Sequence, residues 1–434
     1  MSRSKKQFSW AKSLLLLFLG LTVALSAHLP LAAVAQDIVP SELRGIWLTN
    51  VDSDVLFSTA NLRQGIDRLE KLKFNTIYPT VWNGGYTLYP SKVAKEVLGA
   101  ELDPEPGLQG RDMLEEAIDM GHDKSLSVIP WFEFGLMAPA GSALAQRHPD
   151  WISKRKDGSQ VFQQHNESMV WLNPAHPEVQ QFMKDMMVEV VEKYDLDGVQ
   201  LDDHFGMPVE LGYDEYTVAL YQQEHNGRKP PENPNNPAWK RWRASKVTDL
   251  MLGIYSAVKT RRPDAIVSLS PNPREFSYDM YLQDWANWAR LGFVDELIVQ
   301  IYRNDFSRFL YEVADLEKPE MVRIRSRVPV SIGILTGLRV MNVDMGQIQK
   351  QVQTARDRRF SGFSFFFYGS LGDRDTAFQA MLPSAVGRPL METASRPGAR
   401  PTTQAETRPE AQPVNESRRD AAQRERRDRR QRDI

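Results

Sequence analysis

Two adjacent carboxylates, Asp202 and Asp203, directly follow a short run, Gly-Val-Gln-Leu, that has the length and composition of a β-strand. Side chains of a strand alternate between its two faces, so Gln200 and Asp202 share one face while Leu201 takes the other. If Leu201 packs beneath helices, Asp202 points to the opposite side, where it could act as a nucleophile or base. Asp203 is the second candidate for the role of nucleophile or base. The alternative is an Asp-Asp turn or a helix cap without chemistry.

A third carboxylate, Glu133, lies between Phe132 and Phe134 in a second stretch with the composition of a strand. Alternation places Glu133 on the same face as Trp131. A carboxylate among apolar side chains is costly to bury without a partner, and such surroundings raise its pKa. A raised pKa is what a general acid needs near neutral pH. The alternative is a structural ion pair between Glu133 and an arginine such as Arg44.

Two carboxyl groups that flank one bond are the usual machinery of glycoside hydrolysis. The sequence therefore predicts Glu133 as the acid and Asp202 as its partner. If Glu133 were structural, Asp203 or a loop residue such as Glu275 would supply the acid. The sequence has no zinc-binding helix motif, phosphate loop, nucleophilic-serine motif or dinucleotide fingerprint. We expect no metal and no cofactor; a cluster of His204 with the two aspartates is the alternative that would hold a metal.

Side chains suited to sugars occur near the ends of the same expected strands. Aromatic rings can lie against pyranose rings, and amide or guanidinium groups can bond hydroxyl or acetamido groups. The predicted substrate-binding residues are Arg44, Trp82, Asn83, Trp131, Gln200, His204, Asn272, Gln300, Tyr302 and Tyr368. The alternative for each aromatic residue is a place in the core.

Short β-branched or aromatic runs alternate with longer helical patterns, such as Asn61–Leu72 and Pro177–Tyr194, through most of the chain. This alternation is typical of βα units around a parallel sheet. The predicted strands are Leu43–Leu48, Thr76–Val81, Ser125–Phe134, Gly198–Leu201, Ile266–Leu269, Glu296–Tyr302, Val330–Leu335 and Gly362–Phe367. Eight units predict the α/β class and a closed (β/α)8 TIM barrel; an open, doubly wound sheet is the alternative.

Three connections are unusually long, and they follow Trp82, Phe134 and Phe205. Each begins where a predicted strand ends, which is the face on which barrel enzymes build their active sites. These connections are rich in Trp, His, Tyr and Asn, so we expect them to be ordered and functional. The barrel therefore has long βα loops over the predicted carboxylates.

The two ends of the chain differ from its middle. Residues 1–35 combine a basic head, an apolar run (Leu14–Leu25) and an Ala-Val-Ala site, which predicts a cleaved signal peptide; an uncleaved anchor is the alternative. Residues 36–387 are the predicted barrel domain. Residues 388–434 are rich in Pro, Arg and Glu and poor in apolar residues, which predicts a disordered, charged tail.

Composition narrows the class of protein further. The chain has no cysteine, so it forms no disulfide, and its net charge of −2 does not indicate a nucleic-acid-binding protein. After signal cleavage no segment is apolar enough to span a membrane. We therefore expect a periplasmic or secreted protein.

Six short motifs occur in one order along the chain: Glu42–Thr49, Phe74–Tyr78, Trp131–Gly135, His148–Trp151, Trp171–Pro174 and Asp197–Asp203. Together they resemble the glycosyl-hydrolase-like family 10, and the resemblance covers roughly Ser41 to Leu382. The resemblance implies a bacterial envelope protein with a TIM barrel. It also implies a link to the cleavage of peptidoglycan glycan strands, chiefly those stripped of stem peptides.

The stretch from Gly198 to Asp202 is also similar to the fourth-strand motif of the alpha-amylase superfamily. In that motif an arginine stands two residues before the nucleophilic aspartate. Here Gln200 occupies the position of the arginine and Asp202 that of the nucleophile. The similarity favours Asp202 over Asp203, and it departs from the superfamily at Gln200.

The sequence thus predicts an exported glycosidase whose partner is a polysaccharide, chiefly the peptidoglycan glycan. One alternative is a catalytically silent polysaccharide-binding barrel. Another is a hydrolase of a different exported or storage polysaccharide. Release of fragments from purified glycans distinguishes the three.

Overall fold

The structure is a computed structural model, and it describes residues 41–164, 167–339 and 341–389. The predicted signal peptide, residues 1–35, lies outside the described residues, as do residues 390–434 of the predicted tail. No helix in the described part of the chain is long and apolar enough to cross a membrane.

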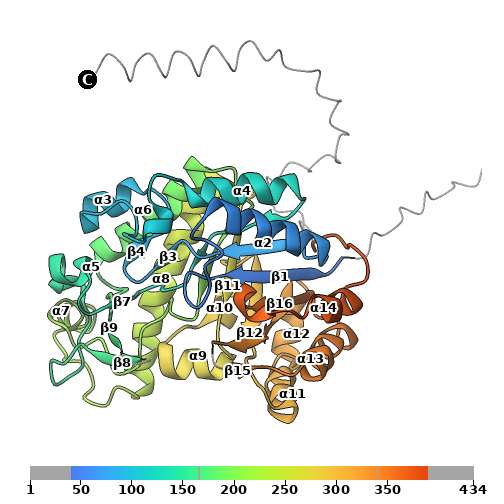
Figure 1. Cartoon of the computed structure of the whole chain (residues 1–434). Helices are drawn as coiled ribbons and strands as arrows, with labels where there is room; N and C mark the ends of the chain where they lie inside the picture. The colour runs from blue at the N-terminus through green and yellow to red at the C-terminus, as the bar shows by residue number, and fades with distance from the viewer. Residues whose placement is uncertain (1–40, 165–166, 340, 390–434) are drawn as a thin grey trace, which may run out of the picture. The chain divides into compact units, whose positions relative to one another are not determined.

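A single parallel sheet forms the centre of the fold (Figure 1). Its strands are ordered β5-β2-β1-β16-β13-β12-β11-β10-β6. Their bounds are β1 Leu43–Leu48, β2 Thr76–Pro79, β5 Ser127–Val128, β6 Trp131–Phe132, β10 Gly198–Asp202, β11 Ile266–Ser270, β12 Glu296–Gln300, β13 Val330–Leu335 and β16 Gly362–Phe366.

The two edges of this order, β5 and β6, are the halves of one predicted strand, Ser125–Phe134, which is interrupted at Pro130. Proline has no N–H to donate, so the ladder breaks there. β5 pairs with β2, β6 pairs with β10, and Thr80 bridges to Trp131. The ring therefore closes, which confirms the eight-strand barrel and shows that the open-sheet alternative is wrong.

Helices alternate with the strands and cover the outside of the barrel (Figure 1). Their apolar faces are buried: in α6, for example, Val179, Phe182, Met186 and Val190 lie at helical spacing and are buried. The bounds are α2 Thr59–Lys71, α3 Lys92–Leu98, α4 Met113–Asp123, α5 Ala143–Arg147, α6 Pro177–Lys193, α7 Glu215–Glu224, α8 Pro237–Arg261, α9 Arg274–Tyr281, α10 Trp285–Leu291, α11 Phe306–Asp315, α12 Pro319–Arg325, α13 Met345–Asp357 and α14 Asp375–Met381.

The three long connections carry structure of their own. The first holds the hairpin β3 (Trp82–Asn83) and β4 (Tyr86–Thr87), and the second holds an antiparallel sheet. The strands of that sheet are β7 Met137–Pro139, β8 Phe162–Gln164 and β9 Glu167–Trp171; a further hairpin, β14 Gly337–Leu338 with β15 Met341–Asn342, follows β13.

The third connection, after β10, is held by a buried arginine of α8. The Arg243 guanidinium donates to the carbonyl oxygens of Val209 and Leu211, the latter at 2.5 Å, and to that of Pro234. The guanidinium carbon also lies 4.6 Å from the centroid of the Trp239 ring, and burial lowers the pKa of Arg243 to about 10. The planar guanidinium of Arg243, with its several N–H donors, thus holds the connection against α8.

A chain of polar side chains runs through the middle of the barrel. Trp47 Nε1 donates to Gln200 Oε1 at 2.7 Å, and Gln200 Nε2 donates to Ser268 Oγ at 2.9 Å. Ser268 Oγ donates to Glu296 Oε1 at 2.8 Å, and the Tyr78 hydroxyl donates to the same oxygen at 3.0 Å. These buried polar groups satisfy one another, as a buried network must.

The described part of the chain ends beside the amino-terminal ends of the barrel strands, where Arg388 is paired with Glu296 and donates to Thr76 Oγ1 at 3.1 Å. Gly387 forms a parallel bridge with Ser41 beside it. The predicted tail begins with Arg388, yet this residue closes the floor of the barrel. The packed part of the chain therefore extends at least to Arg388, because a buried Glu296 needs its counter-charge.

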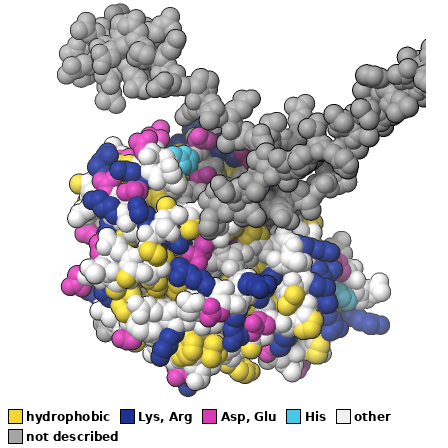
Figure 2. Space-filling model, turned by 90° about the vertical axis from the view of Figure 1, so that its right-hand side faces the viewer, with side chains coloured by type: hydrophobic (Ala, Val, Ile, Leu, Met, Phe, Trp, Pro, Cys, Tyr) yellow, Lys and Arg dark blue, Asp and Glu magenta, His cyan; other side chains and the backbone are white. Residues whose placement is uncertain are grey.

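Charged side chains of both signs cover the described surface. Figure 2 shows one face, on which Lys and Arg side chains lie among Asp and Glu side chains, with hydrophobic side chains scattered between them. This mixture agrees with the net charge of −2.

Candidate active site

The ends of β6 and β10 bring the predicted carboxylates together. Trp131 is in register with Gln200 and Phe132 with Leu201, so Glu133 and Asp202 each follow immediately at the carboxyl-terminal end of adjacent strands. These ends face the long connections, which is the side on which barrel enzymes carry their active sites.

Asp202 is the buried member of the pair. Its Oδ1 accepts the backbone N–H of His204 at 2.9 Å, and its Oδ2 lies 3.3 Å from His204 Nδ1. Only 2% of its side chain is exposed. Burial raises the pKa of Asp202 well above its ordinary value, while the positive charge of His204 opposes the rise.

Asp203 is the accessible member of the pair, with 20% of its side chain exposed. Its Oδ2 accepts Asn272 Nδ2 at 2.7 Å and its Oδ1 accepts Gln300 Nε2 at 3.1 Å. Asn272 follows β11 and Gln300 ends β12, so the next two strands around the barrel hold this carboxylate.

Glu133 lies in the turn after β6 and is partly exposed. Its Oε2 accepts Asn83 Nδ2 at 2.7 Å and Thr80 Oγ1 at 3.2 Å. Burial raises the pKa of Glu133 to about 7, against the opposing effects of His204 and these two donors. A Cβ at Gly135 would lie 2.6 Å from Phe205 N, so only glycine lets this turn approach the loop after β10.

His204 lies among the three carboxylates. Its Nδ1 is 3.1 Å from the carbonyl oxygen of Glu133 and 3.3 Å from Asp202 Oδ2. Burial by itself would lower the pKa of His204, but the charges of Asp203 and Asp202 outweigh it and raise the pKa to about 10. The group is therefore an imidazolium near neutral pH.

The same three residues, Asp202, Asp203 and His204, present ligand atoms within 4.8 Å of one another, which is the alternative metal cluster. Nδ1 of His204 faces two acceptors, so it carries a proton. With the proton on Nδ1, the ring nitrogen that a neutral His204 could offer a metal is Nε2.

Several predicted binding residues do lie at this site, although most of them contact the carboxylates. Asn83 bonds Glu133, Asn272 and Gln300 bond Asp203, and His204 bonds Asp202. Tyr302 is half-buried, and its pKa is raised well above the ordinary value by burial and by the charges of Asp203, Asp202 and Glu133, so its hydroxyl lies in the field of all three.

Other predicted binding residues are placed elsewhere, and these expectations are corrected. Arg44 lies near the start of β1, where it donates to Glu42 Oε2 at 2.7 Å, so it does not pair with Glu133. Gln200 is fully buried, with its amide used inside the barrel. Trp82 is fully buried and donates to Gly135 O at 3.1 Å.

Two aromatic residues need the same correction. Tyr368 packs against α2, where the Arg68 guanidinium lies 5.4 Å from its ring centroid and Gly65 lies beside its hydroxyl. Trp131 is 3% exposed and packs against Trp47 inside the barrel, with ring centroids 6.1 Å apart. The Trp131 ring therefore offers no face to a sugar, whereas the Tyr368 ring stays half-buried beside α2.

Some residues of the site went unpredicted. Thr80 donates to Glu133, and Gln283 Nε2 donates to the carbonyl oxygens of Asp202 at 2.7 Å and Phe205 at 3.0 Å. Tyr281 ends α9 beside the loop after β10, because its carbonyl accepts Met207 N at 2.7 Å. Thr80 lies next to the end of the predicted strand Thr76–Val81, so its place at the barrel mouth could have been predicted as for the other strand-end residues. No pattern in the sequence around Gln283 or Tyr281 indicates that they belong to the site.

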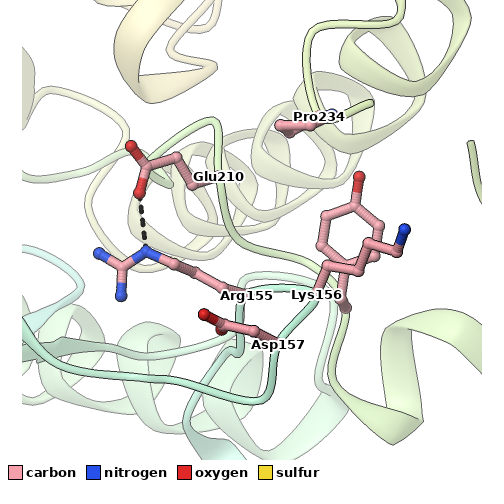
Figure 3. Close-up of a pocket in the computed structure, with 6 residues that line it drawn as sticks. Arg155, Lys156, Asp157, Glu210 and Pro234 are labelled. Atoms are coloured by element: carbon pink, nitrogen blue, oxygen red, sulfur yellow. Dashed lines mark hydrogen bonds and ion pairs between the residues drawn. The ribbon is translucent and has the colours of Figure 1, made fainter. Parts of the chain in front are cut away.

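A separate pocket of about 440 Å³ is lined by residues of the second and third long connections (Figure 3). Figure 3 shows the Arg155 guanidinium pointing to Glu210, to which its Nε donates at 2.7 Å. The lining residues are Arg155, Lys156, Asp157, Glu210, Tyr213 and Pro234, so the pocket does not include the carboxylates.

Several known proteins are similar to this chain in sequence or in fold. Residues 42–355 match the family described as Glycosyl hydrolase-like 10. The chain is 26% identical over 351 residues to the glycosyl hydrolase DigH of Escherichia coli K12, an alignment that covers 68% of this chain and 74% of DigH. It is 25% identical over 320 residues to the glycosyl hydrolase YngK of Bacillus subtilis, covering 65% of this chain and 58% of YngK.

Solved structures support the fold alone. The glycoside hydrolase domain of PgaB (BpsB) from Bordetella bronchiseptica superposes with a TM-score of 0.58 at 13% identity, covering 79% of this chain and 99% of that domain. The catalytic domain of β-amylase from Paenibacillus polymyxa superposes with a TM-score of 0.53 at 10% identity, covering 79% of this chain and 98% of that domain. The motif resemblance is confirmed, and the chain belongs to the glycosyl hydrolase-like family 10.

Proposed function

We propose that this protein is an active glycoside hydrolase in which Glu133 protonates the leaving oxygen. The observation that carries the proposal is the contrast between two nearby carboxyl groups. The pKa of Glu133 is raised to about 7 by burial, so a large fraction carries a proton near neutral pH. Asp203 accepts two amide N–H groups and is open to solvent. A carboxyl group that carries a proton near neutral pH, close to a second carboxyl group that a substrate can reach, is the kind of pair that glycoside hydrolysis uses.

In this proposal Asp203 is the second catalytic carboxylate, which either attacks the anomeric carbon or activates water. The sequence favours Asp202 for this role. Exposure favours Asp203. Its side chain is 20% exposed, whereas that of Asp202 is 2% exposed, so a substrate can reach Asp203 more readily. Asp202 then acts as a positioning residue that holds His204, and the imidazolium faces the negative charge of the site.

We further propose that the substrate is the glycan of the cell wall, with peptidoglycan strands as the leading candidate. Membership of the family supports a polysaccharide substrate. The predicted signal peptide would send the protein to the periplasm or the outside of the cell, where it meets that glycan. A silent binding barrel and a hydrolase of another polysaccharide are the competing functions.

The test is an incubation of the purified protein with peptidoglycan glycan strands, starch and chitin oligomers, followed by mass analysis of the fragments. We expect new reducing ends from peptidoglycan strands alone, formed about 10²- to 10⁴-fold more slowly by the Glu133→Gln variant. Binding of the strands without cleavage would support the silent barrel. Cleavage of starch or chitin in preference to the strands would give another substrate.

A further inference from the structure

We propose that the exposed apolar face of α9, formed by Phe276, Met280 and Tyr281, is a subsite that binds a sugar ring of the polysaccharide beside Asp203. The proposal deepens the proposed function and rests on it for the chemical class of the ligand. The occupant is a further sugar of the chain being cleaved.

The α9 face is unusually apolar for a surface. Phe276 is 48% exposed and Met280 is 47% exposed. They are four residues apart on one helix, so they lie next to each other on the same side. The Tyr281 ring, which is half-buried, has its centroid 5.9 Å from that of Phe276. Contiguous exposed apolar side chains of this kind mark binding sites.

The start of α9 is tied to Asp203. Ser277 Oγ donates to the carbonyl oxygen of Asn272 at 2.9 Å, and Asn272 Nδ2 in turn donates to Asp203 Oδ2 at 2.7 Å. The first turn of the helix and the proposed catalytic carboxylate therefore share one hydrogen-bonding residue.

The end of α9 is tied to the loop that carries the carboxylates. Met207 N donates to the carbonyl oxygen of Tyr281 at 2.7 Å, and Val209 N donates to that of Met280 at 2.8 Å. A Cβ at Gly206 would lie 2.6 Å from the same Tyr281 oxygen, so the loop lies directly against the helix. The pKa of Tyr281 is raised by burial and by the charge of Asp203, which agrees with this closeness.

The Tyr281 ring of the α9 face packs against the antiparallel sheet of the second long connection. The Tyr281 ring lies 6.4 Å from the ring of Trp171, which is buried at the end of β9. Phe162 packs on the other part of Trp171 at 5.2 Å. A ring held in this way loses little conformational freedom when a flat sugar face packs on it.

These contacts explain why the occupant is the substrate and not a separate partner. Both ends of α9 are joined by hydrogen bonds to the surroundings of Asp203, through Asn272 at one end and Met207 at the other. A polysaccharide that places its scissile bond at Asp203 extends beyond it on either side. The α9 face lies beside Asp203 and would bind the sugar next to the scissile bond.

The experiment compares the Phe276→Ala, Met280→Ala double variant with wild type on two substrates: long glycan strands and a single-sugar aryl glycoside. We expect kcat/KM on the strands to fall about tenfold, which corresponds to about 1.4 kcal/mol, and kcat/KM on the aryl glycoside to stay unchanged. Tyr311→Ala, which removes a side chain 78% exposed on the outer helix α11, is the matched control and should leave both values unchanged.

Binding is measured separately, so that this inference and the proposed function can fail independently. Strand affinity is compared between Glu133→Gln and the triple variant that also carries Phe276→Ala and Met280→Ala; the triple variant should bind about tenfold more weakly. If wild type cleaves nothing but this loss of affinity occurs, the subsite stands and the proposed hydrolysis falls. Equal loss on both substrates, or unchanged strand affinity, overturns the subsite. If sedimentation shows that wild type is a dimer and that the Phe276→Ala, Met280→Ala variant is a monomer, the α9 face is a self-association surface, and the subsite is overturned.

Discussion

Asp202 and His204 are joined twice, through the backbone N–H of His204 at 2.9 Å and through its ring Nδ1 at 3.3 Å. The first contact closes the turn after β10, and the second sets a positive ring against a buried carboxylate. His204 Nδ1 also faces the carbonyl oxygen of Glu133 at 3.1 Å. The His204 side chain therefore connects Asp202, at the end of β10, with Glu133, which follows β6.

His204 makes stability depend on pH. Its pKa in the folded protein is about 10, whereas the ordinary value is about 6.5. The stabilisation is fully present below about pH 6.5 and is lost as the pH rises towards 10. We expect the difference in free energy of unfolding between wild type and His204→Gln to shrink between pH 6.5 and pH 10, as measured by urea unfolding. A difference that is constant across this range would contradict the imidazolium.

Glu133→Gln tests the acid. We expect kcat on natural glycan to fall by about 10²- to 10⁴-fold, because the leaving oxygen loses its proton donor. Aryl glycosides with good leaving groups should be spared. In wild type the activity should decline as the pH rises through about 7, since the acid must be protonated, and the variant should lack this decline. Equal losses on both kinds of substrate would argue for a structural role of Glu133.

The two aspartates can be separated by a matched pair of variants. Asp203→Asn should lower kcat more than about 100-fold while the melting temperature stays close to that of wild type. Asp202→Asn should instead lower the free energy of unfolding by about 1–3 kcal/mol, because it disturbs a buried contact with His204. If Asp202→Asn is the inactive, fully stable variant and Asp203→Asn remains active, the roles are reversed.

Arg388 predicts a sharp boundary for truncation. A chain that ends at Gly387 leaves Glu296 buried without its counter-charge, and we expect it to lose about 3–5 kcal/mol of stability. A chain that ends at Pro389 keeps the pair and is the control. Glu296→Gln in the shorter chain should recover part of the loss. Equal melting temperatures of the two truncated chains would show that the floor contact contributes nothing.

The sequence by itself determined the barrel and its rim. Alternation of strand and helix patterns, with eight strand-like runs, predicts a closed parallel ring. Because strand side chains alternate, the sequence predicts Glu133 and Asp202 at the carboxyl-terminal ends of neighbouring strands. The apolar residues around Glu133 in the sequence predict a raised pKa, and burial does raise it.

Only the tertiary structure decided which of these groups are open to substrate and what holds them. Alternation gives the face of a strand, but the inside of a barrel is filled by layers, and the sequence does not say which layer reaches the mouth. Gln200 lies below that mouth and Arg44 near the opposite end of its strand. The partners of the carboxylates come from distant segments, as when Gln300 bonds Asp203 across 97 positions. Such contacts depend on closure of the ring, which no local pattern of residues encodes.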